Sequence, residues 1–220
     1  MFRGIFVTGT DTNVGKTVVS AALMLRYRGE APLRYWKPIQ TGIESDDDSA
    51  EVMRLARCRA EEIVNCGIRL PGSVSPQLAA RRRGTHISVG HVTGLLRAEP
   101  STRWIVEGAG GVFAPINDHE SMLDLMAALG LPVLVVARST LGTINHTRLT
   151  VETLRRQKVR VAGVVMVGHA DEENRAAIEW HAAAEVIAQM PVFAPLAPEG
   201  LAHWATEAFD RNGVLFGCLR

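Results

Sequence analysis

Short β-branched runs alternate along the chain with longer segments of helical period, and this alternation predicts a parallel sheet whose strands are connected by helices. The apolar runs carry few polar positions, which is typical of strands covered by helices on both faces. We therefore expect an α/β fold with a doubly wound, mostly parallel sheet. The expected strands are Ile5–Val7, Leu33–Trp36, Trp104–Val106, Val133–Ala137, Val161–Val167 and Val192–Ala194. The expected helices are Lys16–Tyr27, Ser49–Arg57, Pro76–Arg82, His91–Ala98, Ser121–Leu129, Asn145–Gln157 and Asp171–Gln189.

No Pro/Ser-rich linker, repeat or low-complexity tract divides the 220 residues, so one domain over 1–220 is the simplest expectation. A composition of 47% hydrophobic and 21% charged residues excludes a disordered, collagen-like or disulfide-dense chain. The 24 Lys and Arg nearly balance the 23 Asp and Glu, which leaves a formal net charge of +1. Such a balance offers no field that would steer the chain to nucleic acid or a membrane. We expect neither partner.

The longest apolar stretch, Leu129 to Ala137, contains a proline and is far shorter than the roughly 20 residues that a spanning helix needs. The segment after Met1 has no apolar signal region, which predicts a cytoplasmic protein. The histidines lack the paired spacing of a zinc site. Reduced thiols are expected for the three cysteines, which are widely spaced and without a C-x-x-C pair: Cys58, Cys66 and Cys218.

The segment from Thr8 to Thr17, TGTDTNVGKT, follows the first strand and leads directly into a helix. A G-K-T at this place predicts a phosphate-binding loop and hence the P-loop NTPase type of fold. Backbone N–H groups and the helix N-terminus would hold phosphates, Lys16 would add a positive charge, and the Thr17 hydroxyl could bind magnesium. The loop is a variant, because Thr10 stands where the usual spacing has glycine and Gly9 comes one residue early.

Polar residues also follow other predicted strands, and the carboxyl ends of parallel strands meet at one edge of a sheet. Lys37 precedes a proline, so its backbone should be extended and its side chain should have a defined direction. Glu107 ends an apolar strand, where a carboxylate must be paired, protonated or bound to a cation if the strand is central. We expect a role like that of a Walker B acid, the alternative being an exposed glutamate at the sheet edge. The glycines that follow Glu107 would let a ligand approach the backbone closely.

The acidic run Asp46–Asp48 precedes a predicted helix, and its last members are expected to cap that helix. One of these carboxylates could also reach a magnesium ion on a triphosphate. We choose Asp48 for this role, although the sequence does not separate it from Asp47. Outside the site, Arg81–Arg83 is expected to be a solvated helix end, and Trp180 and Trp204 are expected to be packing residues.

Taken together, these residues resemble the dethiobiotin synthetase family, the ATP-dependent enzymes of the penultimate step of biotin synthesis. The resemblance is carried in order, up to about Ala170, by Gly9–Thr17, Lys37–Pro38 with Thr41–Gly42, Val106–Gly111 and Leu141–His146. It implies that 7,8-diaminononanoate takes up carbon dioxide as a carbamate, that ATP phosphorylates the carbamate, and that the second amine closes a ureido ring.

The resemblance also implies roles for individual residues. Lys16 and Lys37 would be catalytic, and magnesium would be held by Thr17, Asp48 and Glu107. The family is homodimeric, so the diamine would be contacted by Thr12 and Thr41 and, across the dimer interface, by Gly142 and Asn145. The nucleotide would be contacted by Asn13, Val14, Gly15, Lys16, Thr17, Val18, Asp48, Glu107, Gly108, Ala109, Gly110, Val167, Gly168, Pro195 and Leu196.

Two positions depart from the family. Asn13 stands where an acidic residue is common, and Val167-Gly168 stands where an Asn-Asp pair often reads adenine. Because the Val167 side chain cannot hydrogen-bond to a base, this chain is expected to discriminate weakly among nucleoside triphosphates.

Two other classes compete with this interpretation. A ParA- or MinD-like nucleotide switch usually has a second lysine five positions before the invariant one, where this chain has Asp11. Its C-terminus also lacks the basic amphipathic helix of a membrane-binding switch. An amidotransferase-type ATPase would usually bring a glutaminase domain with a nucleophilic cysteine, and none of the cysteines has that setting.

Overall fold

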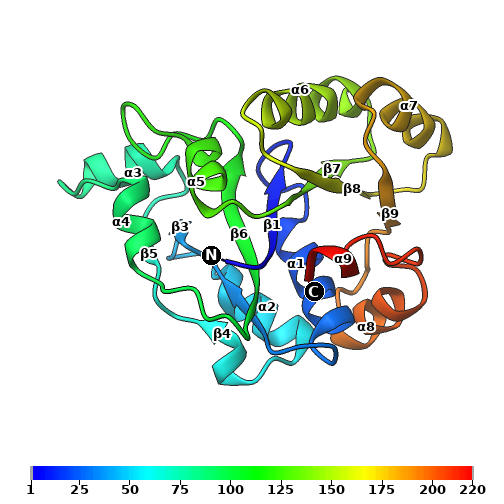
Figure 1. The fold of residues 1–220 in the computed structure, drawn as a ribbon, viewed down its shortest axis with the longest axis horizontal. Coiled ribbons are helices and arrows are strands. Elements are labelled where there is room, and N and C mark those ends of the chain that lie inside the picture. The colour runs from blue at the N-terminus through cyan, green and yellow to red at the C-terminus, as the bar shows by residue number, and fades with distance from the viewer. Residues whose placement is uncertain (1, 220) are drawn as a thin grey trace.

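The computed structural model describes residues 2–219 and has a seven-stranded sheet whose neighbouring strands are all parallel. The strand order is β4-β2-β6-β1-β7-β8-β9 (Figure 1). The strands are β1 (Gly4–Gly9), β2 (Leu33–Trp36), β4 (Ile63–Val64), β6 (Arg103–Gly111), β7 (Val133–Arg138), β8 (Val161–Val167) and β9 (Val186–Met190). A second, two-stranded parallel sheet is formed by β3 (Ile39–Thr41) and β5 (Ile68–Leu70).

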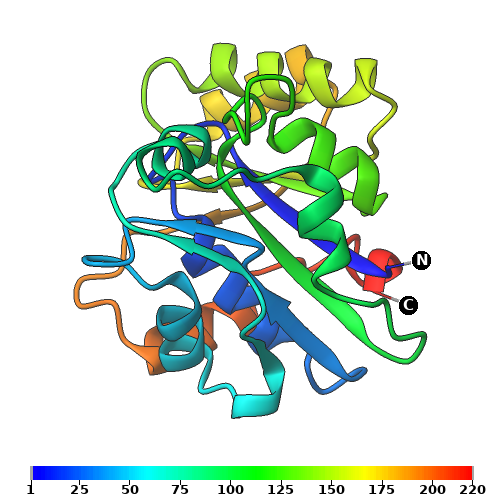
Figure 2. The same ribbon diagram turned by 90° about the vertical axis from the view of Figure 1, so that its left-hand side faces the viewer.

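Helices cover both faces of the large sheet, which confirms the doubly wound α/β fold (Figures 1 and 2). One face packs against α1 (Lys16–Tyr27), α2 (Asp48–Ala56), α8 (Pro198–Glu207) and α9 (Phe216–Leu219). The other packs against α3 (Pro76–Arg82), α4 (Val89–Gly94), α5 (Met122–Leu129), α6 (Thr143–Arg156) and α7 (Glu172–Ala182). A short 3₁₀ helix, η1 (Ala60–Glu62), precedes β4. Along β1, the side chains of Ile5 and Val7 pack on the face that α1 covers, whereas that of Phe6 packs on the opposite face. Successive side chains of a strand alternate between its two faces.

Strand β1 lies in the middle of the sheet, between β6 and β7. The chain leaves β1 through α1 to reach β2 on one side, and later elements extend the sheet through β7, β8 and β9 on the other. The strand order therefore reverses at β1. In such sheets the crevice beyond the carboxyl ends of the strands at the reversal is the expected ligand site.

The expected helix Asp171–Gln189 is confirmed only as far as Ala182, and the expected strand Val192–Ala194 is wrong. Helix α7 ends at Ala182, because Ala183 adopts a left-handed conformation with φ 47°. Two nitrogens of Arg155 then donate to the carbonyls of Ala182 and Ala183, at 2.7 and 2.6 Å. Residues 186–189, which were expected to end this helix, instead belong to strand β9, which pairs in parallel with β8. Alanines at 182–184 favour a helix locally, but pairing with β8 buries the alternate side chains of the following residues.

Other elements differ in their bounds or were not expected. Helix α4 begins at Val89 rather than His91, because the Ser88 side chain caps it by accepting from the His91 N–H. It ends at Gly94, short of the expected Ala98. The short strands β3, β4 and β5 and the helices α8 and α9 were not predicted. Trp204 packs as expected against Phe209, whereas Trp180 is 82% exposed and is not a packing residue.

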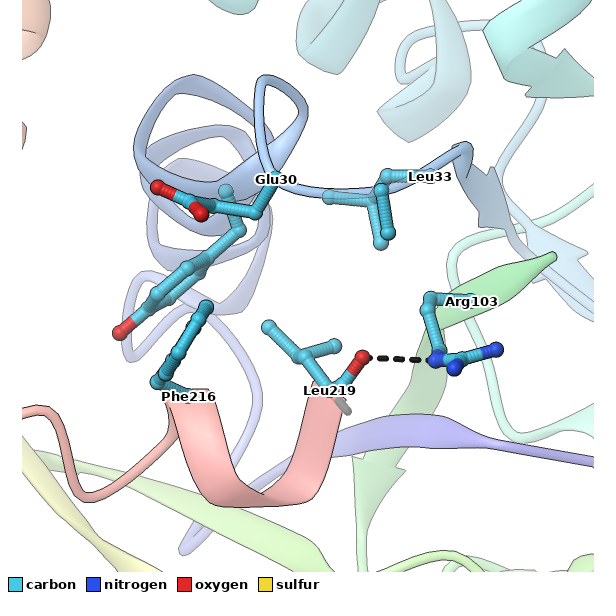
Figure 3. Close-up of a pocket in the computed structure, with 7 residues that line it drawn as sticks. Glu30, Leu33, Arg103, Phe216 and Leu219 are labelled. Carbon is cyan, nitrogen blue, oxygen red and sulfur yellow. Dashed lines mark hydrogen bonds between the residues drawn. The ribbon is translucent and has the colours of Figure 1, made fainter. Parts of the chain in front are cut away.

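The C-terminal segment closes the end of the sheet opposite the carboxyl ends of the strands. The Arg103 side chain, at the start of β6, donates from Nε to the Leu219 carbonyl at 2.6 Å. Between α9 and α1 lies a cavity of about 300 Å³, lined mainly by apolar side chains (Figure 3). None of the expected site residues lines this cavity. Among the described residues, no helix is both long and apolar enough to span a membrane.

Candidate active site

The loop between β1 and α1 has the backbone of a phosphate-binding turn. Asn13 and Gly15 have positive φ angles of 56° and 99°, and α1 begins directly afterwards at Lys16. The N-terminal N–H groups of α1 therefore lie beside the loop, where an anion is stabilised. The Lys16 side chain is buried and donates to the Asp11 carbonyl at 3.1 Å. Burial, followed by the nearby charge of Lys37, lowers the pKa of Lys16.

A cluster of charged and hydroxyl groups lies next to this loop. Lys37 Nζ is 2.6 Å from an Asp48 oxygen and 2.9 Å from Glu107 Oε1. The Thr17 hydroxyl is 2.8 Å from Asp48 Oδ1 and 3.0 Å from Glu107 Oε1. Residues that are far apart in the sequence, just after β2 and on α2, β6 and α1, thus meet within hydrogen-bond distance.

Strand register explains why Lys37 and Glu107 meet. Tyr35 pairs with Ile105 in the parallel ladder between β2 and β6. Because side chains on a strand alternate between faces, Lys37 and Glu107, each two residues further along, project to the same face as this pair. Helix α1 covers that face and brings Thr17 to it.

Glu107 is fully buried on a central strand, so the alternative of an exposed edge glutamate is wrong. It lies within β6 rather than at its end. Burial alone would lower the pKa of Lys37, but the charges of Glu107 and Asp48 outweigh it and raise that pKa above its usual value. Likewise, burial opposes ionisation of Asp48, but Lys37 and the Thr17 hydroxyl hold its pKa below the usual range. The cluster is therefore a charged Lys37 that lies between the side chains of Asp48 and Glu107.

Asp48 and Asp47 have different roles. The Asp47 side chain caps α2 by accepting from the Ala50 N–H at 3.0 Å, and it pairs with Arg69. Asp48 is the carboxylate that faces Thr17 and Lys37. The oxygens of Thr17, Asp48 and Glu107 are the hard donors that Mg²⁺ prefers, so this set fits a magnesium ion that also binds phosphate oxygens and water.

A cleft of about 1,030 Å³ opens over the loop and the cluster. The expected site residues that line it are Thr12, Asn13, Gly15, Lys16, Thr17, Val18, Lys37, Thr41, Asp48, Glu107, Ala109 and Gly110. The Gly108 carbonyl is nearby and accepts from Lys37 Nζ at 3.0 Å. Helix α6 forms an opposite wall through residues at helical spacing, which sequence reasoning missed: His146, Leu149, Thr150 and Thr153. These residues are three or four positions apart, a spacing that indicates one face of a helix and could have pointed to this wall.

Several expected contact residues do not line this cleft: Val14, Gly142, Asn145, Val167, Gly168, Pro195 and Leu196. Val14 is buried in the core, and Leu196 is partly buried against the same core. Val167 is close to the phosphate loop, since a Cβ built on Gly15 would be 3.2 Å from it. Gly168 lies against Ser139 and donates its N–H to the Met190 carbonyl. Val167 is thus beside the loop, and all four residues expected at the base lie outside the large cleft.

Sequence reasoning also missed two side chains that support the cluster. The Tyr35 hydroxyl donates to Glu107 Oε2 at 3.0 Å, and the Gln40 side chain accepts from the Asp48 N–H at 3.3 Å. Burial, followed by the charge of Glu107, raises the pKa of Tyr35 well above its usual value, so this phenol keeps the proton that it donates to Glu107. No sequence motif marks Tyr35, because it lies in a mainly apolar run that predicts only a buried strand.

Comparison with known proteins decides the family. A family model described as an AAA domain matches residues 3–200. The ATP-dependent dethiobiotin synthetase BioD of Paramagnetospirillum magneticum is 48% identical over 188 residues, which cover 86% of this chain and 87% of the relative. The chain belongs to the dethiobiotin synthetase family. The BioD of Brucella ovis is 38% identical over 94% of this chain and 93% of its own length. The bifunctional protein BioCD of Bordetella avium is 42% identical over 97% of this chain and 44% of that longer protein.

Solved structures similar to this member of the dethiobiotin synthetase family support the fold. A ParA family ATPase from Chlorobium tepidum has a TM-score of 0.51 at 10% identity and covers 93% of this chain and 98% of its own. A nucleotide-binding protein from Archaeoglobus fulgidus in complex with ADP has a TM-score of 0.53 at 14% identity, over 92% of this chain and 86% of its own. These likenesses show the P-loop fold alone. The sequence relatives favour the dethiobiotin synthetase interpretation over a ParA- or MinD-like switch.

Proposed function

We propose that this chain closes the ureido ring of dethiobiotin in the three steps that the family resemblance implies. ATP-dependent dethiobiotin formation in biotin biosynthesis follows from membership of the family. The proposed steps are carbamate formation from 7,8-diaminononanoate and carbon dioxide, phosphorylation of the carbamate by ATP, and attack by the second amine with release of phosphate. Phosphoryl transfer of this kind requires positioning and charge neutralisation more than covalent catalysis.

The observation that carries the proposal is the position of Lys37. A phosphate-binding loop alone suits any nucleotide hydrolase, but here a second lysine is buried between Asp48 and Glu107 beside Thr17. In this proposal Lys37 holds the carbamate oxygens next to the terminal phosphoryl group. Lys16 and the N–H groups of α1 bind the phosphates.

Thr17, Asp48 and Glu107 would hold magnesium, which would offset the negative charge of the triphosphate. The Thr17 hydroxyl would offer an oxygen lone pair to the ion while its proton stays directed at one of the two acidic side chains. Thr12 and Thr41, on the cleft wall, would contact the diamine.

The test is stimulation of ATP hydrolysis. With this protein and Mg²⁺, 7,8-diaminononanoate and bicarbonate together should stimulate phosphate release and yield dethiobiotin, whereas either one alone should not. A dethiobiotin product that is detected by mass spectrometry in proportion to phosphate supports the assignment. Equal hydrolysis with and without the diamine would favour a nucleotide switch and contradict it.

We also propose that this chain discriminates weakly among nucleoside triphosphates with different bases. Val167 and Gly168 offer no side-chain hydrogen bond to a base, although Val167 lies close to Gly15 of the phosphate loop. CTP and GTP should therefore support ring closure with kcat/KM within about tenfold of ATP, since one discriminating hydrogen-bonding pair is worth about 1–3 kcal/mol. Initial rates of dethiobiotin formation with each nucleotide provide the measurement. A preference for ATP of a hundredfold or more would contradict the proposal.

A homodimer is the proposed assembly, with Gly142 and Asn145 reaching the diamine bound to the other subunit. In support, Phe113 and Leu149 line the cleft yet are 68% and 58% exposed, and Leu141 is fully exposed just before α6. Large exposed apolar side chains are typical of surfaces that a partner covers. We further propose that residues 1–220 work as one domain in the cytoplasm, where ATP is available. Residues 1 and 220 lie outside the described part of the chain.

A further inference from the structure

Glu107 uses its two carboxylate oxygens differently. Oε1 faces the cluster, where it lies 2.9 Å from Lys37 Nζ and 3.0 Å from the Thr17 hydroxyl. Oε2 points the other way and accepts a hydrogen bond from the Tyr35 hydroxyl at 3.0 Å. Both Tyr35 and Glu107 are 0% exposed, so water does not replace this bond.

We propose that Tyr35 is a positioning residue that fixes Glu107 for magnesium. The phenol engages Oε2 and so holds the carboxylate in the orientation that directs Oε1 to Thr17 and the phosphate loop. The inference rests on the magnesium role proposed above for Glu107. It adds a residue that no motif identified, since Tyr35 lies within an apolar strand and does not line the cleft.

The physical reason is the cost of leaving a buried carboxylate oxygen without a donor. Such an oxygen loses its bonds to water, and in a buried site the loss amounts to more than that of an ordinary hydrogen bond. Without Tyr35, Glu107 would relieve this cost by rotating, which would move Oε1 away from Thr17. Residues that orient metal ligands in this way typically change metal affinity 10–100-fold when removed.

The chain provides a matched control, because it has only two tyrosines and both donate to carboxylates. Tyr27 donates to the buried Asp210 beside the C-terminal segment, at the end of the sheet opposite the site. Tyr27→Phe removes a hydroxyl of the same kind without touching the cluster. Comparing Tyr35→Phe with Tyr27→Phe therefore separates a general loss of stability from a specific loss of magnesium affinity.

The first experiment measures magnesium dependence. In Tyr35→Phe, the Mg²⁺ concentration for half-maximal dethiobiotin formation at saturating ATP should rise about tenfold. Mn²⁺ binding to the complex of the variant with a non-hydrolysable ATP analogue, measured by electron paramagnetic resonance, should weaken by a similar factor. Tyr27→Phe should keep both values within about twofold of the wild type. Unchanged Mn²⁺ affinity in folded Tyr35→Phe would overturn the proposal.

A second experiment does not depend on the folding of Tyr35→Phe. The wild type labelled with 3-fluorotyrosine should give two ¹⁹F resonances, and Tyr27→Phe assigns the one that remains to Tyr35. Adding Mg²⁺ to the complex with the ATP analogue should shift the Tyr35 resonance and leave that of Tyr27 in place. If the wild type makes dethiobiotin but the Tyr35 resonance does not respond, the positioning role is wrong. If the wild type makes no dethiobiotin, the proposed function fails instead.

Discussion

At the scale of single residues, Lys37 shows how the fold keeps a charge inside the protein. The charge of a lysine that is only 6% exposed would be costly on its own, and its contacts with Asp48 and Glu107 offset that cost. Lys16 interacts with the same two acidic side chains, so the site holds two lysines and two acidic residues before any ligand binds. Binding of a cation by the acidic residues would free Lys37 to face an anionic substrate.

Replacing Lys37 separates catalysis from nucleotide binding. Lys37→Gln should lower the rate of dethiobiotin formation by about 100-fold or more, because it removes a charged donor from the reacting group. The dissociation constant of a fluorescent ATP analogue should change less than about threefold, since the phosphates are held by the loop and Lys16. Lys16→Ala is the comparison, and it should abolish turnover and weaken nucleotide binding while its thermal unfolding stays close to that of the wild type. Equal losses of rate and binding in Lys37→Gln would make Lys37 a nucleotide ligand.

At the scale of elements, the success of sequence reasoning depended on how local the signal was. The position of the phosphate loop could be predicted, because Gly15, Lys16 and Thr17 lie within one turn between a strand and a helix. Tyr35 could not, because its partner Glu107 is 72 residues away and only the β2–β6 register brings the two together. Strand β9 was missed because its alanine-rich approach favours a helix locally and only pairing with β8 overrides it.

A contact between two elements also holds the phosphate loop. Arg138, at the end of β7, is 2.7 Å from the Asp11 carboxylate, and the Asp11 carbonyl accepts from Lys16. The two side chains are 40% and 54% exposed, so the pair adds less than about 1 kcal/mol to stability. Arg138→Ala should nevertheless raise the KM for ATP about three- to tenfold by loosening the loop. The double variant Asp11→Arg/Arg138→Asp should recover part of the loss.

The control for this prediction is the similarly exposed pair of Arg34 and Glu99, which lies 3.1 Å apart at the other end of the sheet. Arg34→Ala should leave the KM for ATP unchanged. Steady-state kinetics on the four proteins, with thermal unfolding to check the fold, provides the measurement. The role of Arg138 in holding the loop would be disproved if both single variants had the same KM as the wild type.

At the scale of the whole molecule, the parallel sheet and its cover of helices on both faces could be predicted, whereas the strand order and the shape of the substrate cleft could not. The carboxyl end of β2, the strand β6 and the start of α1 bring Lys37, Glu107 and Thr17 to one edge of the sheet. The wall formed by α6 depends on how that helix lies over the sheet, which its own sequence does not specify. The same helix presents Leu149 at the cleft with 58% exposure, an apolar surface that one chain leaves uncovered.

This surface gives a test of the proposed homodimer. Leu149→Glu should raise the dimer dissociation constant by about 30-fold or more, the effect of losing about 2 kcal/mol at an interface centre. Trp180→Glu is the control, because Trp180 is more exposed still, at 82%, but lies on α7 and does not line the cleft. Sedimentation velocity over a concentration series measures both. If the diamine spans the interface, Leu149→Glu should also raise the KM for 7,8-diaminononanoate more than the KM for ATP, and adding protein should reduce the difference. A wild type that stays monomeric at all concentrations while making dethiobiotin would show that each subunit holds a complete site, and the exposed leucine would then need another explanation.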